Sequence, residues 1–66
     1  MKGTVTSYGK KNGYGFIESD TGEIFFFHHT QWNLPIKPQA NLIVEFDPVD
    51  TEKGRQAQNV QRARRP

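Results

Sequence analysis

Hydrophobic side chains gather in two short runs of the chain, residues 13–19 and residues 24–28, which have the composition of strands. Successive side chains of a β-strand point to opposite faces, so each run predicts a strand with two distinct faces. The cluster Ser-Asp-Thr-Gly at residues 19–22 favours a tight turn, which makes the two strands an antiparallel hairpin. Pairing in this hairpin predicts one row of neighbouring rings. This row consists of Tyr14, Phe16, Phe26 and His28.

The opposite face of the same hairpin is also largely apolar. It carries Gly15 and Ile17 from the first run and Phe25 and Phe27 from the second. One of the two rows must face water, because both belong to one hairpin. Phenylalanine is usually a core residue, so the alternation alone does not decide which row is buried.

Three further segments have the composition of strands. Lys2–Tyr8 suits a pleated surface, and Val5 is its best core candidate. In Leu42–Pro48 every second residue is apolar, which is typical of a half-buried strand. Arg55–Gln61 predicts the last strand. Its expected core residues are Ala57 and Val60.

The segments between these strands are rich in turn-forming residues. Gly9–Gly13 predicts a basic turn, and Val49–Gly54 predicts a charged turn. Thr30–Asn41 contains two prolines and predicts a long loop with room for one helical turn after His29. No stretch of ten residues shows a period of 3.6, so helices cannot form a layer. We therefore predict an all-β fold, a small five-stranded antiparallel barrel, because closure removes the unpaired edges of short strands.

The size of the chain limits it to one domain, residues 1–66, with a small core. It has no cysteine, which excludes disulfides and thiolate metal sites. It shows neither an apolar signal core nor a run of about 20 apolar residues, so we expect an unprocessed cytoplasmic protein with no membrane partner. The net charge is +2, and basic residues gather in the tail, residues 62–66. Such a tail suits a polyanion, although a merely solvated terminus has the same composition.

Over nearly its whole length the chain resembles the bacterial cold-shock domain family. Gly-Thr-Val at residues 3–5 resembles the opening strand of the family, and residues 54–60 resemble its closing strand. Gly-Tyr-Gly-Phe-Ile-Glu at residues 13–18 resembles the first ribonucleoprotein motif, and residues 25–28 resemble the second. The resemblance implies an OB-type barrel that binds single-stranded RNA and DNA through exposed aromatic side chains. It also implies a cytoplasmic role as an RNA chaperone, antiterminator or regulator of transcription or translation.

The chain departs from the family pattern at positions that matter for stacking. The family usually has Lys-Trp-Phe-Asn after the opening strand, whereas residues 6–9 are Thr-Ser-Tyr-Gly, so Ser7 stands in place of a stacking tryptophan. Asn12 replaces the expected lysine, and His29 replaces the aromatic residue that usually follows the motif histidine. We therefore expect weaker binding or a different base preference, with the fold unchanged.

The resemblance also indicates which row of rings faces outward, namely the row of Tyr14 and Phe16, with Phe25 and Phe27 in the core. It further implies that basic residues in the flanking turns contact phosphates. The predicted nucleic-acid-binding residues are Tyr8, Lys10, Lys11, Tyr14, Phe16, Phe26, His28, His29 and Arg55. Trp32 is expected to pack at one end of the barrel, and stacking in compensation for the missing tryptophan is the alternative.

Other chemistry finds little support in the sequence. A strand would point the adjacent residues His28 and His29 to opposite faces, and no third metal ligand stands at a suitable spacing. No nucleophile triad, phosphate-binding glycine loop or carboxylate pair can be identified. We expect no metal, no cofactor, no small-molecule substrate and no enzymatic activity, and we expect a monomer.

Two other classes of protein share parts of the pattern. An RNA-recognition motif also contains Gly-Tyr-Gly-Phe, but it needs two helices and a longer chain, and Ser19 stands where its next aromatic residue is expected. A protein-interaction module, in which an OB-type barrel docks a peptide or subunit on its rings, fits the same pattern. It predicts no salt-dependent affinity for single strands.

Overall fold

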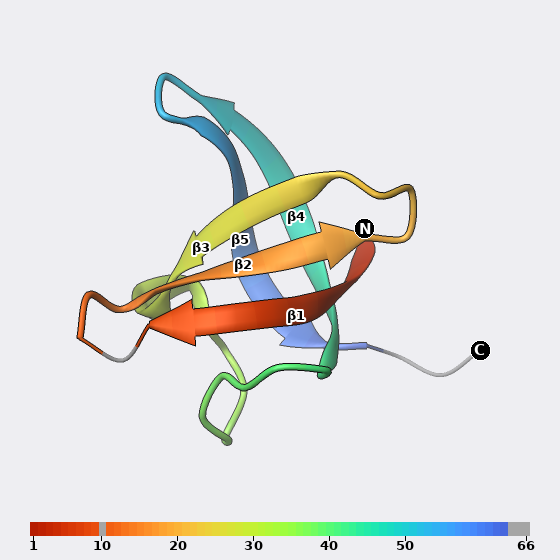
Figure 1. The fold of residues 1–66 in the computed structure, drawn as a ribbon. Coiled ribbons are helices and arrows are strands. Elements are labelled where there is room, and N and C mark those ends of the chain that lie inside the picture. The colour runs from red at the N-terminus through yellow and green to blue at the C-terminus, as the bar shows by residue number, and fades with distance from the viewer. Residues whose placement is uncertain (10, 64–66) are drawn as a thin grey trace.

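The structure is a computed structural model that describes residues 1–9 and 11–63, and it folds into five strands and one short 3₁₀ helix (Figure 1). The strands are β1 (Lys2–Gly9), β2 (Tyr14–Ser19), β3 (Ile24–His28), β4 (Ile43–Thr51) and β5 (Gly54–Arg62). The helix η1 (His29–Gln31) follows β3 directly, at the place where the sequence left room for a helical turn. All five predicted strands are confirmed.

The strands form a closed barrel in the order β1-β2-β3-β5-β4. β1 pairs antiparallel with both β2 and β4, and antiparallel pairing also joins β2 to β3 and β4 to β5. The ring is completed by a parallel contact between β3 and β5 at Phe26 and Gln56. Figure 1 shows β1, β2 and β3 in front of the crossing strands β4 and β5. The predicted small OB-type barrel is therefore confirmed.

The barrel interior holds the apolar rows that the alternation singled out. The buried hydrophobic side chains are Val5, Ile17, Phe25, Phe27, Val44, Phe46, Ala57 and Val60. Partly buried side chains pack against them at the margin of the core, namely Tyr8, Trp32, Leu34 and Leu42. The expected core residues Val5, Ala57 and Val60 are confirmed. The core contains neither Tyr14 nor Phe16, so these two rings are not needed to fill the barrel.

Short polar turns fix the β1–β2 and β2–β3 hairpins. In the first turn, the Gly13 amide donates to the Gly9 carbonyl (3.0 Å), and Gly13 has a positive φ of 73°, which favours glycine. In the second turn, the Ser19 amide donates to the Glu23 carbonyl (2.8 Å), and the Ser19 hydroxyl accepts from the Glu23 amide (3.1 Å). These turns set the register of the paired strands.

The β4–β5 connection is tighter than the sequence predicted. The expected charged turn covered Val49–Gly54, but antiparallel pairing continues to Thr51 opposite Gly54. The Thr51 hydroxyl donates to the Gly54 carbonyl (2.8 Å), and Gly54 adopts a φ of 122°. Because the partner strand supplies backbone bonds to Val49–Thr51, these residues extend β4 although their side chains are mostly exposed.

Candidate nucleic-acid interface

Four rings lie side by side on the outer surface of the β2–β3 hairpin. The register pairs Tyr14 with His28 and Phe16 with Phe26, as the alternation predicted. The Tyr14 ring centroid lies 4.8 Å from that of His28 and 6.3 Å from that of Phe26. Tyr14 is 42% exposed and Phe16 47% exposed, whereas Phe26 and His28 are half-buried. We call this surface, formed by Tyr14, Phe16, Phe26 and His28, the ring face.

The inner face of the same hairpin carries the buried row, which contains Phe25 and Phe27. Phe27 is fully buried and Phe25 is 3% exposed, and both belong to the core together with Ile17. Gly15 lies directly over Phe27, since a Cβ atom at Gly15 would stand 2.6 Å from the Phe27 Cζ atom. The absence of a side chain at Gly15 lets the Phe27 ring pack against the strand backbone, beneath the ring face.

Tyr8 does not join the ring face. The register of β1 against β2 shifts between Val5 and Ser7, so that Ser7 pairs with Phe16 and Tyr8 pairs with Gly15. A β-bulge of this kind moves the following residues to the other face of the strand. Tyr8 therefore lies on the inner side, half-buried, with its ring nearly parallel to that of Phe27 at a centroid distance of 6.0 Å. The predicted outward position of Tyr8 is wrong, because the sequence did not reveal the bulge.

The bulge brings Ser7 to the outer surface beside Phe16. Ser7 is exposed and pairs with Phe16 across the β1–β2 ladder. The neighbouring Thr6 hydroxyl donates to the Phe16 carbonyl (3.3 Å). The ring face thus ends at Phe16 with small polar side chains, at the place where the resembling family usually carries a tryptophan.

The two histidines lie together at the other end of the ring face. His28 is the N-terminal cap of η1, and its Nδ1 atom accepts from the Thr30 amide (3.4 Å) and lies 2.9 Å from the Thr30 hydroxyl. The ring centroids of His28 and His29 are 4.2 Å apart. A continuous strand would have separated the two rings, but the chain leaves the strand geometry at His29 and enters η1, so the rings lie together. The described residues contain no group of three or more side chains that could hold a metal ion.

His29 is held in place by the β1–β2 turn. Its amide donates to the Gly13 carbonyl (2.8 Å), and a Cβ atom at Gly13 would stand 2.5 Å from the His29 Cδ2 atom. Lys11, which is exposed, lies in the same turn, whereas Lys10 lies outside the described residues. The turn that contacts His29 therefore also carries an exposed basic residue, Lys11.

Arg55 is engaged elsewhere. Its guanidinium forms an ion pair with Glu23 and lies 3.9 Å from Asp50. Arg55 also lines a hollow with Met1 and Phe25, on the core side of β3. Side chains alternate along β5, so Arg55 and its neighbour Gln56 point to opposite faces, and only Gln56 is aligned with Phe26. The predicted place of Arg55 beside the rings is not what the structure shows.

Lys53 and Gln56 take that place, and neither of them is among the predicted binding residues. A hollow of about 370 Å³ adjoins the ring face. The residues that line this hollow are Tyr14, Phe26, Thr51, Glu52, Lys53 and Gln56. The register of the β4–β5 hairpin would have identified Lys53 and Gln56, because the tighter turn between these strands brings Lys53 toward Phe26.

Trp32 packs as predicted at one end of the barrel. Its ring lies 5.5 Å from that of Phe27 at an interplanar angle of 27°, and its indole nitrogen donates to the Ile36 carbonyl (2.6 Å). Tyr8 and Trp32 thus both stack on the buried Phe27 ring.

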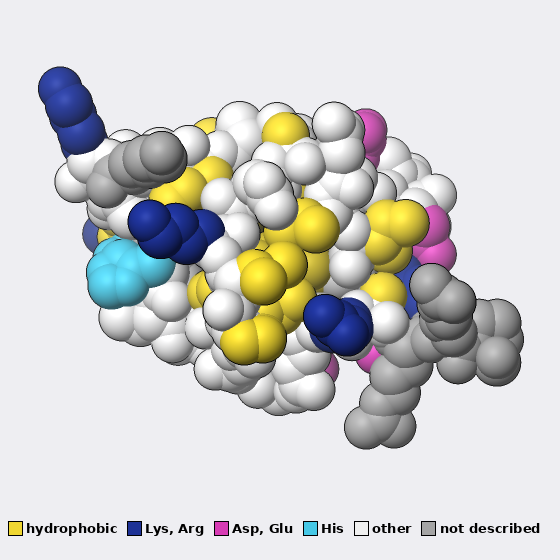
Figure 2. Space-filling view, turned by 90° about the horizontal axis from the view of Figure 1, so that it is seen from below, with side chains coloured by type: hydrophobic (Ala, Val, Ile, Leu, Met, Phe, Trp, Pro, Cys, Tyr) yellow, Lys and Arg dark blue, Asp and Glu magenta, His cyan; other side chains and the backbone are white. Residues whose placement is uncertain are grey.

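Figure 2 views the side of the barrel on which the β3–β4 connection of Figure 1 lies. Hydrophobic side chains gather in the middle of this side, Lys and Arg side chains flank them, and acidic ones lie toward the margin.

A small closed barrel that carries an outward row of rings beside basic turns defines a class of nucleic-acid-binding β-barrel domains. Within this class, the chain belongs to the cold-shock domain family. The family described as the 'Cold-shock' DNA-binding domain matches residues 1–63. A cold shock-like protein of Aquifex aeolicus is 41% identical over 63 residues, which cover 91% of this chain and 90% of that protein.

Other relatives come from bacteria and from animals. Cold shock-like protein CspC of Bacillus cereus is 37% identical over 62 residues, which cover 91% of this chain and 95% of that protein. Y-box-binding protein 1 of Xenopus laevis is 45% identical over 65 residues, which cover 88% of this chain and 22% of that protein. The chain thus spans about a fifth of the length of the Y-box relatives. The similarity covers nearly all of each bacterial protein but only one part of the larger animal protein. Among the described residues, no helix is long and apolar enough to cross a membrane.

Proposed function

We propose that this domain binds single-stranded RNA and DNA with low sequence specificity, by stacking unpaired bases on the ring face. The observation that carries this proposal is the row of outward rings over a core that is filled without them. Contiguous exposed apolar surface on a small domain usually marks a binding site. Stacking suits unpaired bases of any sequence, because every base has a π-face.

The charges around the rings support a polyanionic ligand. Lys11 lies in the turn beside His29, and Lys53 lines the hollow beside Tyr14 and Phe26. These lysines would contact phosphates of a strand laid along the ring face, and Lys10 belongs to the same turn in sequence. Each phosphate contact on a single strand contributes a slope of about −0.7 in the dependence of log affinity on log salt. Binding is therefore expected to weaken as salt rises.

The number of rings determines the expected affinity, and the need for unpaired bases indicates the biological role. Each base–aromatic stack contributes about 1–3 kcal/mol by alanine substitution, so three or four stacks support dissociation constants between micromolar and nanomolar. A protein that needs unpaired bases competes with RNA secondary structure. The domain would therefore act as an RNA chaperone, antiterminator or regulator of transcription or translation, as a cytoplasmic monomer, without catalysis, cofactor or membrane partner.

A salt titration of binding to a short oligo-dT strand and to its RNA counterpart, with duplex DNA as control, tests this function. We expect tight binding to both single strands, weak binding to the duplex, and a negative salt slope for the single strands. If a protein-interaction module were the correct class, the single strands would show no salt-dependent affinity. That result would refute the proposed function.

A further inference from the structure

An unusual backbone conformation occurs in β5, away from the ring face. Asn59 has a positive φ of 53°, in the left-handed region that residues other than glycine rarely adopt. It lies where the β4–β5 register is irregular: Glu45 pairs with Gln61, but Asp47 pairs with Gln58. The bulge at Asn59 turns its amide and side chain out of the ladder, so they are available for other partners.

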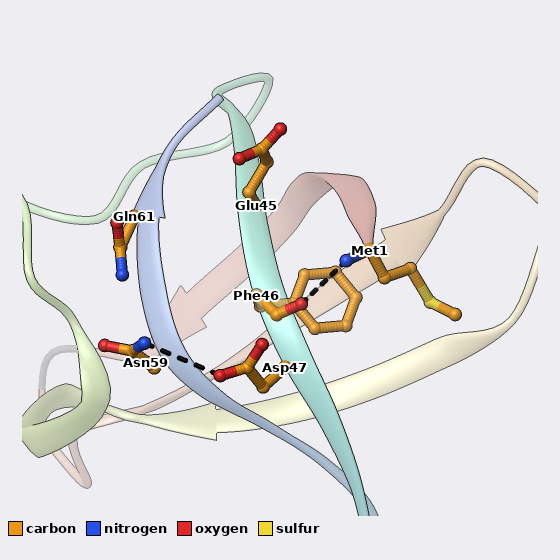
Figure 3. A pocket seen from close by; sticks show the side chains of 6 residues that line it. All are labelled: Met1, Glu45, Phe46, Asp47, Asn59 and Gln61. Atoms are coloured by element: carbon orange, nitrogen blue, oxygen red, sulfur yellow. Dashed lines mark hydrogen bonds between the residues drawn. The ribbon is translucent and has the colours of Figure 1, made fainter. Parts of the chain in front are cut away.

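Those partners come from β4, from the last residue of η1 and from the segment that follows it. The Asn59 amide donates to the Gln31 Oε1 atom (3.2 Å), and the Asn59 Oδ1 atom accepts from the Asn33 Nδ2 atom (2.8 Å). On the other side, the Asn59 Nδ2 atom donates to the Asp47 Oδ2 atom (3.5 Å), as Figure 3 shows. Beside this cluster, the Asn33 amide donates to the Val60 carbonyl (2.9 Å). Asn59 therefore ties the end of η1 to the β4–β5 hairpin.

The segment held in this way carries the histidine end of the ring face. The helix η1 has three residues and buries none of them, and the Gly13 carbonyl holds only its first residue, so the far end of the helix depends on other contacts. The Trp32 amide donates to the His29 carbonyl (3.1 Å), and this bond links His29 to the tethered segment. His28 caps the same helix and lies against Tyr14. A tether at the end of η1 thus restricts both histidine rings.

We propose that Asn59 is a positioning residue for nucleic-acid binding, which holds η1 so that His28 and His29 continue the surface offered by Tyr14. This rests on the proposed function, because it assumes that the histidine rings contact the bound strand. Asn59 itself lies in the cluster with Asp47 and Asn33 and takes no part in the ring face. Its effect on binding would be indirect, through the order of the two histidines.

The chain offers a matched control for this position. Asn41 also has a left-handed backbone, with φ of 73°, and its amide donates to the Val5 carbonyl (2.8 Å), at a site separate from η1. Asn59→Gly and Asn41→Gly make the same chemical change, and glycine tolerates both backbone conformations. We expect Asn59→Gly to weaken binding of oligo-dT by about threefold to tenfold, a fraction of one base stack, and Asn41→Gly to change it by less than about twofold.

A double-mutant cycle shows whether the effect passes through the histidines. Asn59→Gly keeps the amide bond to Gln31 and loses the two side-chain bonds to Asn33 and Asp47. In a His28→Ala/His29→Ala background it should weaken binding no further, and in the wild-type background it should weaken the nuclear Overhauser contacts between the Tyr14 and His28 rings. An equal loss in both backgrounds, or no loss in either, overturns the positioning role. If Asn59→Gly does not fold, Gln31→Ala/Asn33→Ala removes the acceptor of the Asn59 amide and the donor to the Asn59 side chain, and the same outcomes decide.

The two proposals fail in different ways. Loss of oligo-dT binding by Phe16→Ala together with an unchanged Asn59→Gly protein would reject the positioning role and keep the proposed function. Absence of oligo-dT binding by the wild-type protein would reject the proposed function. In that case, weakening of the Tyr14–His28 contacts in Asn59→Gly would show that the tether orders η1 for some other purpose and would overturn its assignment to nucleic-acid binding.

Discussion

Replacing Phe16 by alanine removes an outward ring from the β1 end of the ring face while leaving the core untouched. The Phe16 side chain is 47% exposed, and its strand neighbours on the outer surface are Ser7 and Phe26. Loss of one base–aromatic stack costs about 1–3 kcal/mol of binding free energy, which is about fivefold to 150-fold in dissociation constant. Because the ring keeps much of its surface in water, the loss in free energy of unfolding should be at most about 1 kcal/mol.

Phe27→Ala is the matched control on the same hairpin. Phe27 is fully buried between the rings of Tyr8, at a centroid distance of 6.0 Å, and Trp32, at 5.5 Å. Truncation of a buried phenylalanine costs about 3–5 kcal/mol. A domain of this length has a total free energy of unfolding of about 3–10 kcal/mol. Phe27→Ala should therefore unfold the domain or leave it barely stable.

Urea unfolding followed by circular dichroism, combined with fluorescence-anisotropy titration of a labelled oligo-dT strand, separates the two effects. Phe16→Ala should keep a midpoint close to that of the wild type and bind more weakly. A Phe16→Ala protein that loses several kcal/mol of stability but binds normally would show that the face assignment is inverted. The same reasoning would be refuted if Phe27→Ala were folded and stable but defective in binding.

Three further substitutions test neighbouring features of the surface. Gly15→Ala places a Cβ atom 2.6 Å from Phe27 Cζ and 2.7 Å from the Ser7 carbonyl oxygen, so urea unfolding should show a loss of about 1–3 kcal/mol; an unchanged midpoint would contradict this packing. Ser7→Trp adds a ring beside Phe16 and should tighten oligo-dT binding by up to one stack, about 1–3 kcal/mol, unless bound bases do not reach the β1 side of the face. Lys53→Ala should reduce the magnitude of the salt slope by about 0.7, because it removes one phosphate contact. Arg55→Ala loses only exposed ion pairs with Glu23 and Asp50 and should leave the salt slope unchanged. Equal salt slopes for the two variants would argue against this division of roles.

Short-range alternation was sufficient to predict most of the fold. The period of two in residues 13–19 and 24–28 predicted the hairpin, and the structure pairs Phe16 with Phe26 as expected. The turn residues predicted where these strands end, because glycine and hydroxyl side chains act within a few residues of their own position. The core residues Val5, Ala57 and Val60 followed from the same local rules.

The errors share one kind of origin, which is local departure from regular two-residue alternation: a bulge, a longer hairpin ladder and a strand that ends in a helical turn. A single-residue shift of register moves every later side chain to the other face, and this shift carries Tyr8 inward and Ser7 outward. The continued pairing of β4 with β5 moves Lys53 toward the rings, and the alternation of β5 takes Arg55 to Glu23. Departure from strand geometry at His29 brings its ring against His28.

The sequence by itself determined the class of fold and the existence of two ring-bearing rows, because alternation and turn chemistry are properties of neighbouring residues. Only the tertiary structure decided which row faces outward and which residues border the ring face, because this depends on bulges and on barrel closure. The contacts of Asn59 illustrate the difference, since its partners Gln31 and Asp47 lie far from it in the chain. Such contacts depend on the relative positions of several strands in the barrel, and no local pattern of residues encodes these positions.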